Sequence, residues 1–269
     1  MKRQTYIGYL SPVFLTIILV LGVVSPPHVS SLGNQRDSQR WIGTWAAAPQ
    51  LPPQGGMGAF HNQTLRLIVH TSAGGKTVRI RISNVFGDQP LVVGSAHIAR
   101  RTDGANIDPS SDRILNFDKK PSVKIPAGSL AVSDAVDLDV SALSDLAISL
   151  FFPYPTPATT LHILAQQTSY ISPEKGDFTA QLNFSIGEKI GYWPFLAGID
   201  VNASRRGAAV VAFGSSLTDG DGSTEDANRR WPDVLAERFQ KNGYTELGVL
   251  NEGMIGNLSL IHISEPTRP

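Results

Sequence analysis

Cysteine is absent from this chain of 269 residues. Without a thiol the protein cannot form a disulfide, a thiolate metal site or a cysteine nucleophile. An excess of charge is also absent, because 23 Lys and Arg residues balance 23 Asp and Glu residues. A neutral chain gives no electrostatic reason to expect a nucleic-acid partner or an anionic membrane surface. The hydrophobic content of 41% is enough for a folded core, which excludes a disordered protein.

The first part of the chain has the composition of a secretory signal peptide. Lys2 and Arg3 precede an apolar run over residues 13–24, and small residues follow. We therefore expect residues 1–31 to be a signal peptide and residues 32–40 a linker, so that the mature protein is secreted or periplasmic. The apolar run is shorter than the roughly 20 residues that cross a bilayer, so we expect no stable membrane span after cleavage. An uncleaved N-terminal anchor is the alternative.

Helical periodicity is nearly absent before residue 205. Apolar and polar residues alternate over 64–70 and 77–83, as a strand with one buried face requires. Clusters of Gly, Pro and Asp separate such runs. Further strand candidates are residues 91–98, 123–125, 131–138, 146–152 and 161–167. Many short strands with regular turns predict an all-β sandwich or jelly-roll-like domain over residues 41–200.

The pattern changes after residue 205. Residues 207–213 form a continuous apolar run, which is typical of a parallel strand covered on both faces. Trp231, Leu235 and Phe239 then follow at helical spacing, and residues 247–250 make a second apolar strand. This order predicts the start of an α/β domain over residues 205–257, incomplete in this chain.

The turn between the first of these strands and the helix contains two serines. It reads FGSSLTDG over residues 213–220. A serine at the N-terminus of a helix can present its hydroxyl for nucleophilic attack and its free N–H to an oxyanion. Thr218 occupies the position of the second glycine in the G-x-S-x-G elbow, so the α/β-hydrolase motif does not fit.

This turn resembles block I of the GDSL/SGNH hydrolases, F-G-D-S-[IL]-T-D-G. The sequence VLNEGMIGN, at residues 249–257, is similar to block II, N-x-G-I-S-G-N. Residues 41–49 and 83–87 look like the N-terminal β domain of secreted bacterial esterases in this family. The resemblance implies that the α/β part is a flavodoxin-like three-layer SGNH domain.

The resemblance also implies a function and its residues. The protein would be a serine ester hydrolase that cleaves small-molecule or carbohydrate-linked carboxylic esters through an acyl-serine, without a cofactor or metal. Ser216 would be the nucleophile, and Gly256 would donate its N–H to the oxyanion hole. Ser215 stands where the family has Asp, which leaves Ser215 as the alternative nucleophile, and Ile255 replaces the block II serine.

The family takes its catalytic base, and the carboxylate that orients the base, from a C-terminal D-x-x-H, and an oxyanion Asn from G-x-N-D. Neither pattern follows Ser216 here. The one later histidine, His262, lies in residues 258–269, which look like a translated sequencing adapter, so we expect an artefactual tail and no base at His262. The chain alone is therefore expected to be inactive.

Other residue patterns in the chain fit a functional site less well. Asp219 begins a calcium-like loop, but Thr224 stands where the loop needs glycine. Four histidines lack metal-ligand spacing and are expected to be structural: His61, His70, His97 and His162. Trp41, Trp45 and Trp193 fit core packing better than a sugar-binding platform. The alternative function is a carbohydrate- or partner-binding β module fused to a non-catalytic remnant.

Overall fold

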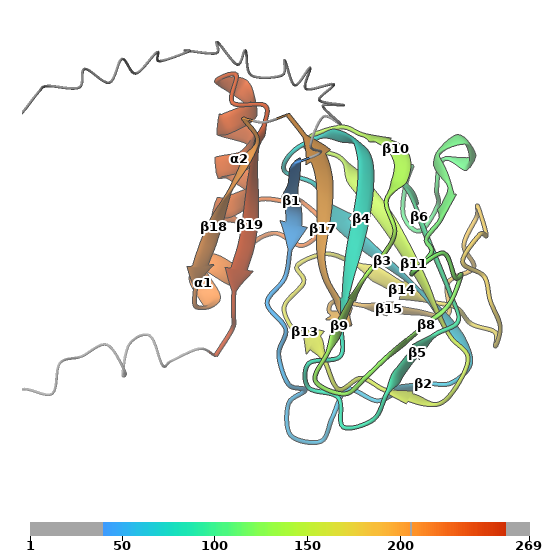
Figure 1. Ribbon diagram of the computed structural model, residues 1–269. Helices are drawn as coiled ribbons and strands as arrows, with labels where there is room; N and C mark the ends of the chain where they lie inside the picture. The colour runs from blue at the N-terminus through green and yellow to red at the C-terminus, as the bar shows by residue number, and fades with distance from the viewer. Residues whose placement is uncertain (1–39, 205, 257–269) are drawn as a thin grey trace, which may run out of the picture. The chain divides into compact units, whose positions relative to one another are not determined.

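The computed structural model describes residues 40–204 and 206–256 (Figure 1). The expected signal peptide, nearly all of the linker and the tail with His262 lie outside this part of the chain. All described residues belong to one compact unit. None of the helices found in this unit has the length and apolar character needed to cross a membrane.

Two antiparallel sheets make up most of the unit. The first has the order β1 (Arg40–Ala46), β17 (Leu196–Ala203), β4 (Gly75–Ser83) and β10 (Val136–Val140), and β9 (Leu130–Val132) also pairs with β4. The second has the order β15 (Glu188–Ile190), β14 (Ser169–Ile171), β3 (Gln63–His70), β11 (Asp145–Phe152), β6 (Ser95–Arg100) and β7 (Arg113–Ile114).

Three short two-stranded ladders flank these sheets: β5 (Leu91–Val93) with β8 (Val123–Ile125), β2 (Ala59–Phe60) with β12 (Thr156–Pro157), and β13 (Leu161–His162) with β16 (Trp193–Pro194). A 3-10 turn, η1, covers Pro109–Ser111.

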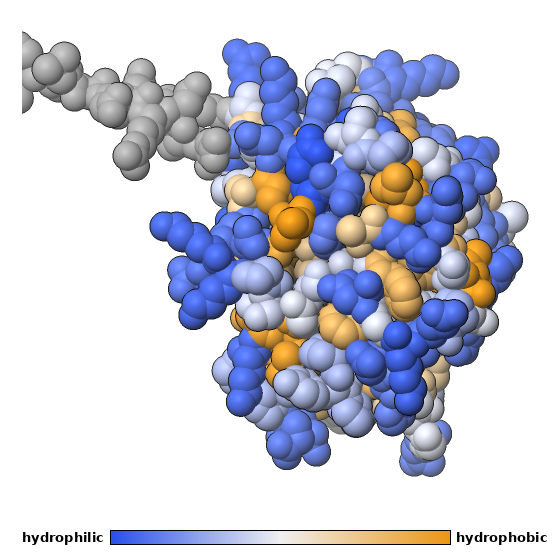
Figure 2. Space-filling model, turned by 90° about the vertical axis from the view of Figure 1, so that its right-hand side faces the viewer, coloured by the Kyte–Doolittle hydropathy of each residue, from blue (hydrophilic) through white to orange (hydrophobic). Residues whose placement is uncertain are grey.

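On the face of the molecule shown in Figure 2, hydrophilic residues predominate and apolar residues form separate small patches.

The hydrophobic core lies between the two sheets. Alternate residues of β3 and β4 enter it, because side chains of a strand alternate between its faces: Leu65, Leu67 and Val69 from one strand, and Val78, Ile80 and Ile82 from the other. Trp45 and Trp193 are 5% and 1% exposed and pack edge to face with ring centres 4.9 Å apart. The packing interpretation of these two tryptophans is confirmed.

A parallel strand–helix–strand unit packs against β1. It consists of β18 (Ala208–Gly214), α1 (Ser216–Asp219), α2 (Trp231–Lys241) and β19 (Leu247–Gly253). β19 lies beside β1, where a Cβ on Gly248 would collide with the carbonyl oxygen of Gly43. Val249 N–H donates to the Ser72 hydroxyl at 2.8 Å. Glycine at positions 43 and 248 therefore allows the close approach that joins this unit to the β sheets.

The expectation of a three-layer α/β domain is wrong for this structure. Strands account for 44% of the described residues and helices for 8%, and these residues contain two α-helices. The run predicted to be covered on both faces, β18, leaves Val211 and Phe213 56% and 61% exposed. In α2 the buried residues are Pro232 and Ala236, whereas Trp231, placed on the predicted apolar face, is exposed.

Several predicted strands also have different bounds. The candidate at 91–98 is interrupted at Gly94, between β5 and β6, and the candidate at 131–138 divides into β9 and β10. Only the first two residues of 161–167 form a strand, β13. Alternation of residue type shows which side chains can be buried, but each strand ends where its hydrogen-bonding partner ends, and the partner is distant in sequence.

Candidate functional site

Ser216 is the first residue of α1 and follows the carboxyl end of β18 almost directly. Gly214 is the last residue of β18 and pairs with Gly253 at the end of β19. A Cβ on Gly214 would collide with the Thr218 side chain, and a Cβ on Gly253 would collide with the Asp219 backbone. These two glycines therefore permit the tight turn that brings the serine to the strand ends.

The Ser216 side chain is half-buried, and its hydroxyl has no hydrogen-bond partner among the described residues. Its carbonyl oxygen accepts from the N–H groups of Gly220 and Asp221, both at 2.9 Å. Ser215 is the N-cap of α1 in extended conformation and makes no side-chain capping bond. Within residues 40–204 and 206–256, the Ser216 hydroxyl therefore makes no hydrogen bond to a base.

A buried acid–base pair lies just beyond the serine. The Asp219 side chain is 1% exposed and its Oδ1 lies 2.8 Å from Nε2 of His162, which is 4% exposed. The other ring nitrogen, Nδ1, lies 3.0 Å from the carbonyl oxygen of Ala48 and must donate to it. Asp219 Oδ2 accepts the N–H of Ile255 at 2.6 Å.

The hydrogen bonds allow two protonation forms of this pair. Because the Ala48 oxygen only accepts, Nδ1 of His162 carries a hydrogen. The contact to Asp219 then needs one more hydrogen, either on Nε2 as an imidazolium or on the carboxyl group. In both forms the pair is neutral overall, which suits a site excluded from water. The His162–Asp219 hydrogen bond connects β13 to the turn that contains Ser216.

The turn after β19 contains Gly256 and is bonded to the same residues. Met254 N–H donates to the Gly214 carbonyl oxygen at 3.1 Å, one residue before Ile255 reaches Asp219. Gly256 is exposed and has a φ of 75°, a conformation that favours glycine. The structure therefore brings together the turns that hold the two residues predicted from the motifs, Ser216 and Gly256.

Sequence reasoning missed the pairing of His162 with Asp219. The sequence pattern predicts a structural histidine at His162, and it places Asp219 only in the motif and in a loop that does not fit calcium. The two residues are 57 positions apart, on a short strand and on a helix. No local pattern connects residues that meet only after the two parts of the chain have packed together.

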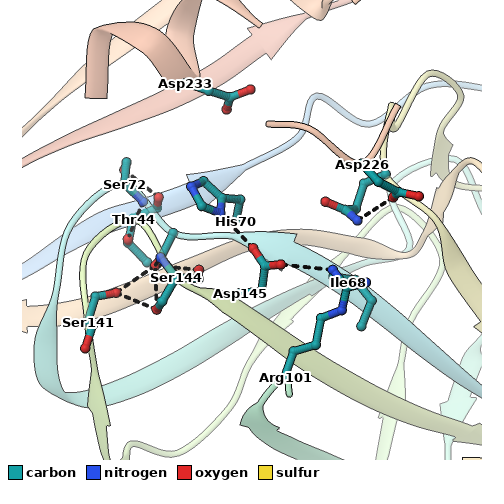
Figure 3. Close-up of polar contacts among 12 residues, drawn as sticks. Thr44, Ile68, His70, Ser72, Arg101, Ser141, Ser144, Asp145, Asp226 and Asp233 are labelled. Atoms are coloured by element: carbon teal, nitrogen blue, oxygen red, sulfur yellow. Dashed lines mark hydrogen bonds and ion pairs between the residues drawn. The ribbon is translucent and has the colours of Figure 1, made fainter. Parts of the chain in front are cut away.

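A second grouping of Ser, His and Asp side chains lies near β1 (Figure 3). Nδ1 of His70 is 2.7 Å from Asp145, whose other oxygen accepts from Arg101 at 2.9 Å. The Ser72 hydroxyl donates to the Thr44 carbonyl oxygen at 2.6 Å and accepts from Val249 N–H. Since this buried hydroxyl already acts as a hydrogen-bond donor and as an acceptor, Ser72 is a structural residue and no nucleophile.

The Asp145 carboxyl group has a lowered pKa. Burial acts to raise it, but the hydrogen bond from His70 and the charges of His70 and Arg101 outweigh burial. A lowered folded-state pKa means that the ionised carboxylate stabilises the fold above the unfolded value of about 3.9. That contribution is lost as the pH falls through the folded-state pKa.

The Asp145→Asn variant should lower the free energy of unfolding at pH 7 by about 1–3 kcal/mol, because charged hydrogen bonds to His70 and Arg101 are weakened. Urea unfolding at several pH values checks this, with exposed Asp139→Asn as the control. The difference from the unchanged protein should shrink below pH ~4. If the difference in the free energy of unfolding stayed constant down to the lowest pH measured, this would contradict the lowered pKa of Asp145.

No group of three or more His, Asp or Glu side chains in the described ranges is arranged to hold a metal ion. Three of the histidines contact a single carboxylate each: His70 with Asp145, His97 with Asp112 and His162 with Asp219. The chain matches no protein-family model, and no curated protein shows significant similarity to it.

Proposed function

We propose that the chain carries the nucleophile of a secreted or periplasmic serine ester hydrolase of the GDSL/SGNH type. The observation that supports this is the position of Ser216 at the carboxyl end of a parallel strand, beside the Gly256 turn. Within residues 40–204 and 206–256 the Ser216 hydroxyl has no hydrogen-bond partner. Ligands of parallel α/β units bind at the carboxyl ends of the strands. The proposed substrates are small-molecule or carbohydrate-linked esters.

In the proposed reaction Ser216 Oγ attacks the ester carbonyl carbon and the alcohol leaves, giving an acyl-serine that water then hydrolyses. The N–H groups of Ser216 and Gly256 would donate to the oxyanion. A base must take the hydroxyl proton and return it to the leaving alcohol. His162 does not fit that role, because both of its ring nitrogens are already bonded, to Asp219 and to Ala48.

The base would instead come from a C-terminal D-x-x-H segment of the family type. We expect the chain alone to show no turnover of p-nitrophenyl acetate above the Ser216→Ala background, and a protein that carries the same chain with such a segment to be active. The expected difference in kcat is about 10⁴-fold or more, the size of effect seen when a serine hydrolase loses its base.

Two outcomes would contradict parts of the proposal. Turnover by the chain alone that disappears in Ser216→Ala would support Ser216 as the nucleophile but would show that a base already exists within the chain. An extended, folded protein without any ester hydrolysis would favour the alternative, in which the β region is a carbohydrate- or partner-binding module. That alternative is supported by the complete hydrophobic core between the two sheets.

A further inference from the structure

One edge of β18 has no neighbouring strand among the described residues. In Figure 1, β18 lies on the side of β19 that is turned away from β1. Ala208 N–H donates to the Glu246 carbonyl oxygen, and the Gly214 carbonyl oxygen accepts from Met254 N–H, both at 3.1 Å. The even-numbered residues of β18 therefore face β19. Successive residues of a strand bond to opposite edges, so these residues direct their N–H and C=O groups to the open edge: Ala209, Val211 and Phe213.

The side chains along this edge are apolar and exposed. Val211 and Phe213 are mostly exposed, and so is Leu217 in α1, which follows the strand. The strand reads AAVVAFG and pairs with β19 without a register shift, so it has no charged residue, proline or bulge. Those are the features by which folded proteins protect an edge from a further strand. The open edge of β18 can therefore accept one.

A second copy of β18, running antiparallel, matches this edge. The outward-facing residues are spaced evenly about Val211, so Val211 lies opposite Val211 of the second copy, and Ala209 opposite Phe213 of the second copy. Each of these pairs exchanges two backbone hydrogen bonds. The large ring of Phe213 then stands opposite the small side chain of Ala209. A two-fold axis at Val211 therefore makes the edge complementary to itself.

Charged residues at the two ends of β18 favour the antiparallel direction. Arg206 precedes the strand and Asp221 follows α1, and both are exposed. Neither side chain has an ion-pair partner within residues 40–204 and 206–256. In the antiparallel register, Arg206 of one copy lies opposite the start of α1 in the other copy, close to the turn that contains Asp221. A parallel pair would instead bring Arg206 beside Arg206, which is unfavourable.

We propose that the open edge of β18 is an interface between two copies of this chain. The two strands pair about a two-fold axis and form a continuous four-stranded sheet, in the order β19, β18, β18, β19. The contact consists of one strand edge and a few side chains, so the interface is small and the Kd is expected to be on the order of 1–100 µM. This inference does not rest on the proposed function, because it involves no step of ester hydrolysis.

Sedimentation of the mature chain, residues 32–269, tests the proposal over concentrations from about 1 to 200 µM. We expect a reversible equilibrium between monomer and dimer. Val211→Lys places two ammonium groups opposite each other and should raise the Kd about tenfold or more. Leu130→Lys is the matched control, because Leu130 of β9 is exposed to a similar extent, 61% against 56% for Val211, and should leave the Kd unchanged.

Three results of this experiment would overturn the proposal. A chain that stays monomeric at the highest concentration would leave the edge to a strand of another segment or another protein. Association that Val211→Lys does not weaken, with an unchanged circular dichroism spectrum, would place the contact elsewhere. Species that grow beyond a dimer would show open-ended association in place of a closed two-fold pair.

Single cysteines test the register. The chain has no cysteine, so each variant contains one thiol. Opposite residues of a hydrogen-bonded pair have Cα atoms about 5.5 Å apart, within the range that a disulfide spans. Val211→Cys should therefore form a disulfide-linked dimer on mild oxidation. Ala209→Cys should not, because its two thiols would be four residues apart along the strands, roughly 13 Å. No disulfide in Val211→Cys, or equal yields in both variants, would contradict the pairing about Val211.

Discussion

Replacing Ser216 by alanine should abolish ester hydrolysis in a protein that carries this chain together with its catalytic base. Without the nucleophile no acyl-serine forms, and kcat should fall about 10⁴- to 10⁶-fold, leaving the effects of binding and of the oxyanion donors. The Ser216 side chain is half-buried and its hydroxyl has no hydrogen-bond partner in the described part of the chain, so its removal leaves no buried partner there unsatisfied. The free energy of unfolding should change by no more than about 0.5 kcal/mol.

Ser215→Ala is the matched control for this result. Ser215 precedes the helix in extended conformation and makes no side-chain capping bond. Loss of the Ser215 hydroxyl should change kcat by no more than about tenfold, which is the effect of losing one hydrogen bond. Full activity in Ser216→Ala together with loss of activity in Ser215→Ala would show that the alignment of the turn is wrong by one residue.

Asp219→Ala should cause the largest loss of stability. The substitution removes the carboxyl group that is hydrogen-bonded to the buried His162 and to the partly buried N–H of Ile255. Breaking one side of a buried pair costs about 3–5 kcal/mol. Urea unfolding measures this loss of stability, with Asp221→Ala as the control. Asp221 is exposed on the same turn, so its substitution should change the free energy of unfolding by less than about 0.5 kcal/mol.

A double-mutant cycle with His162→Ala isolates the contact itself. The two single substitutions should together cost more than the double variant, by a coupling energy of about 1–3 kcal/mol. A coupling energy near zero would mean that Asp219 acts through Ile255 alone. The pair would then not hold β13 against the nucleophile turn.

The sequence predicted the strands of the β sheets better than the surroundings of the parallel strands. The alternating runs at 64–70 and 77–83 correspond to β3 and β4, because one buried face imposes a period of two on the residue types. The apolar run at 207–213 correctly predicted a strand, β18, and a parallel partner. It did not predict exposed Val211 and Phe213, because coverage of a strand depends on what packs on it.

For the site, motif positions were sufficient to place Ser216 and Gly256 on adjoining turns. Those positions follow from the strand–turn–helix order, which is local in sequence. The His162–Asp219 pair depends on how β13 packs against the turn that contains α1. Residues so far apart in the chain share no periodicity or spacing, and sequence reasoning had no means to connect them.

Identification of the residue modified by a phosphonate ester probe tests the central claim most directly. The probe reacts with an activated serine, and mass spectrometry of the digested protein locates the adduct. With the base present, we expect the label on Ser216 of the turn that follows β18, and no label in Ser216→Ala. A label on Ser215 or on a serine of the β sheets, or labelling that persists in Ser216→Ala, would contradict the assignment of Ser216 as the nucleophile.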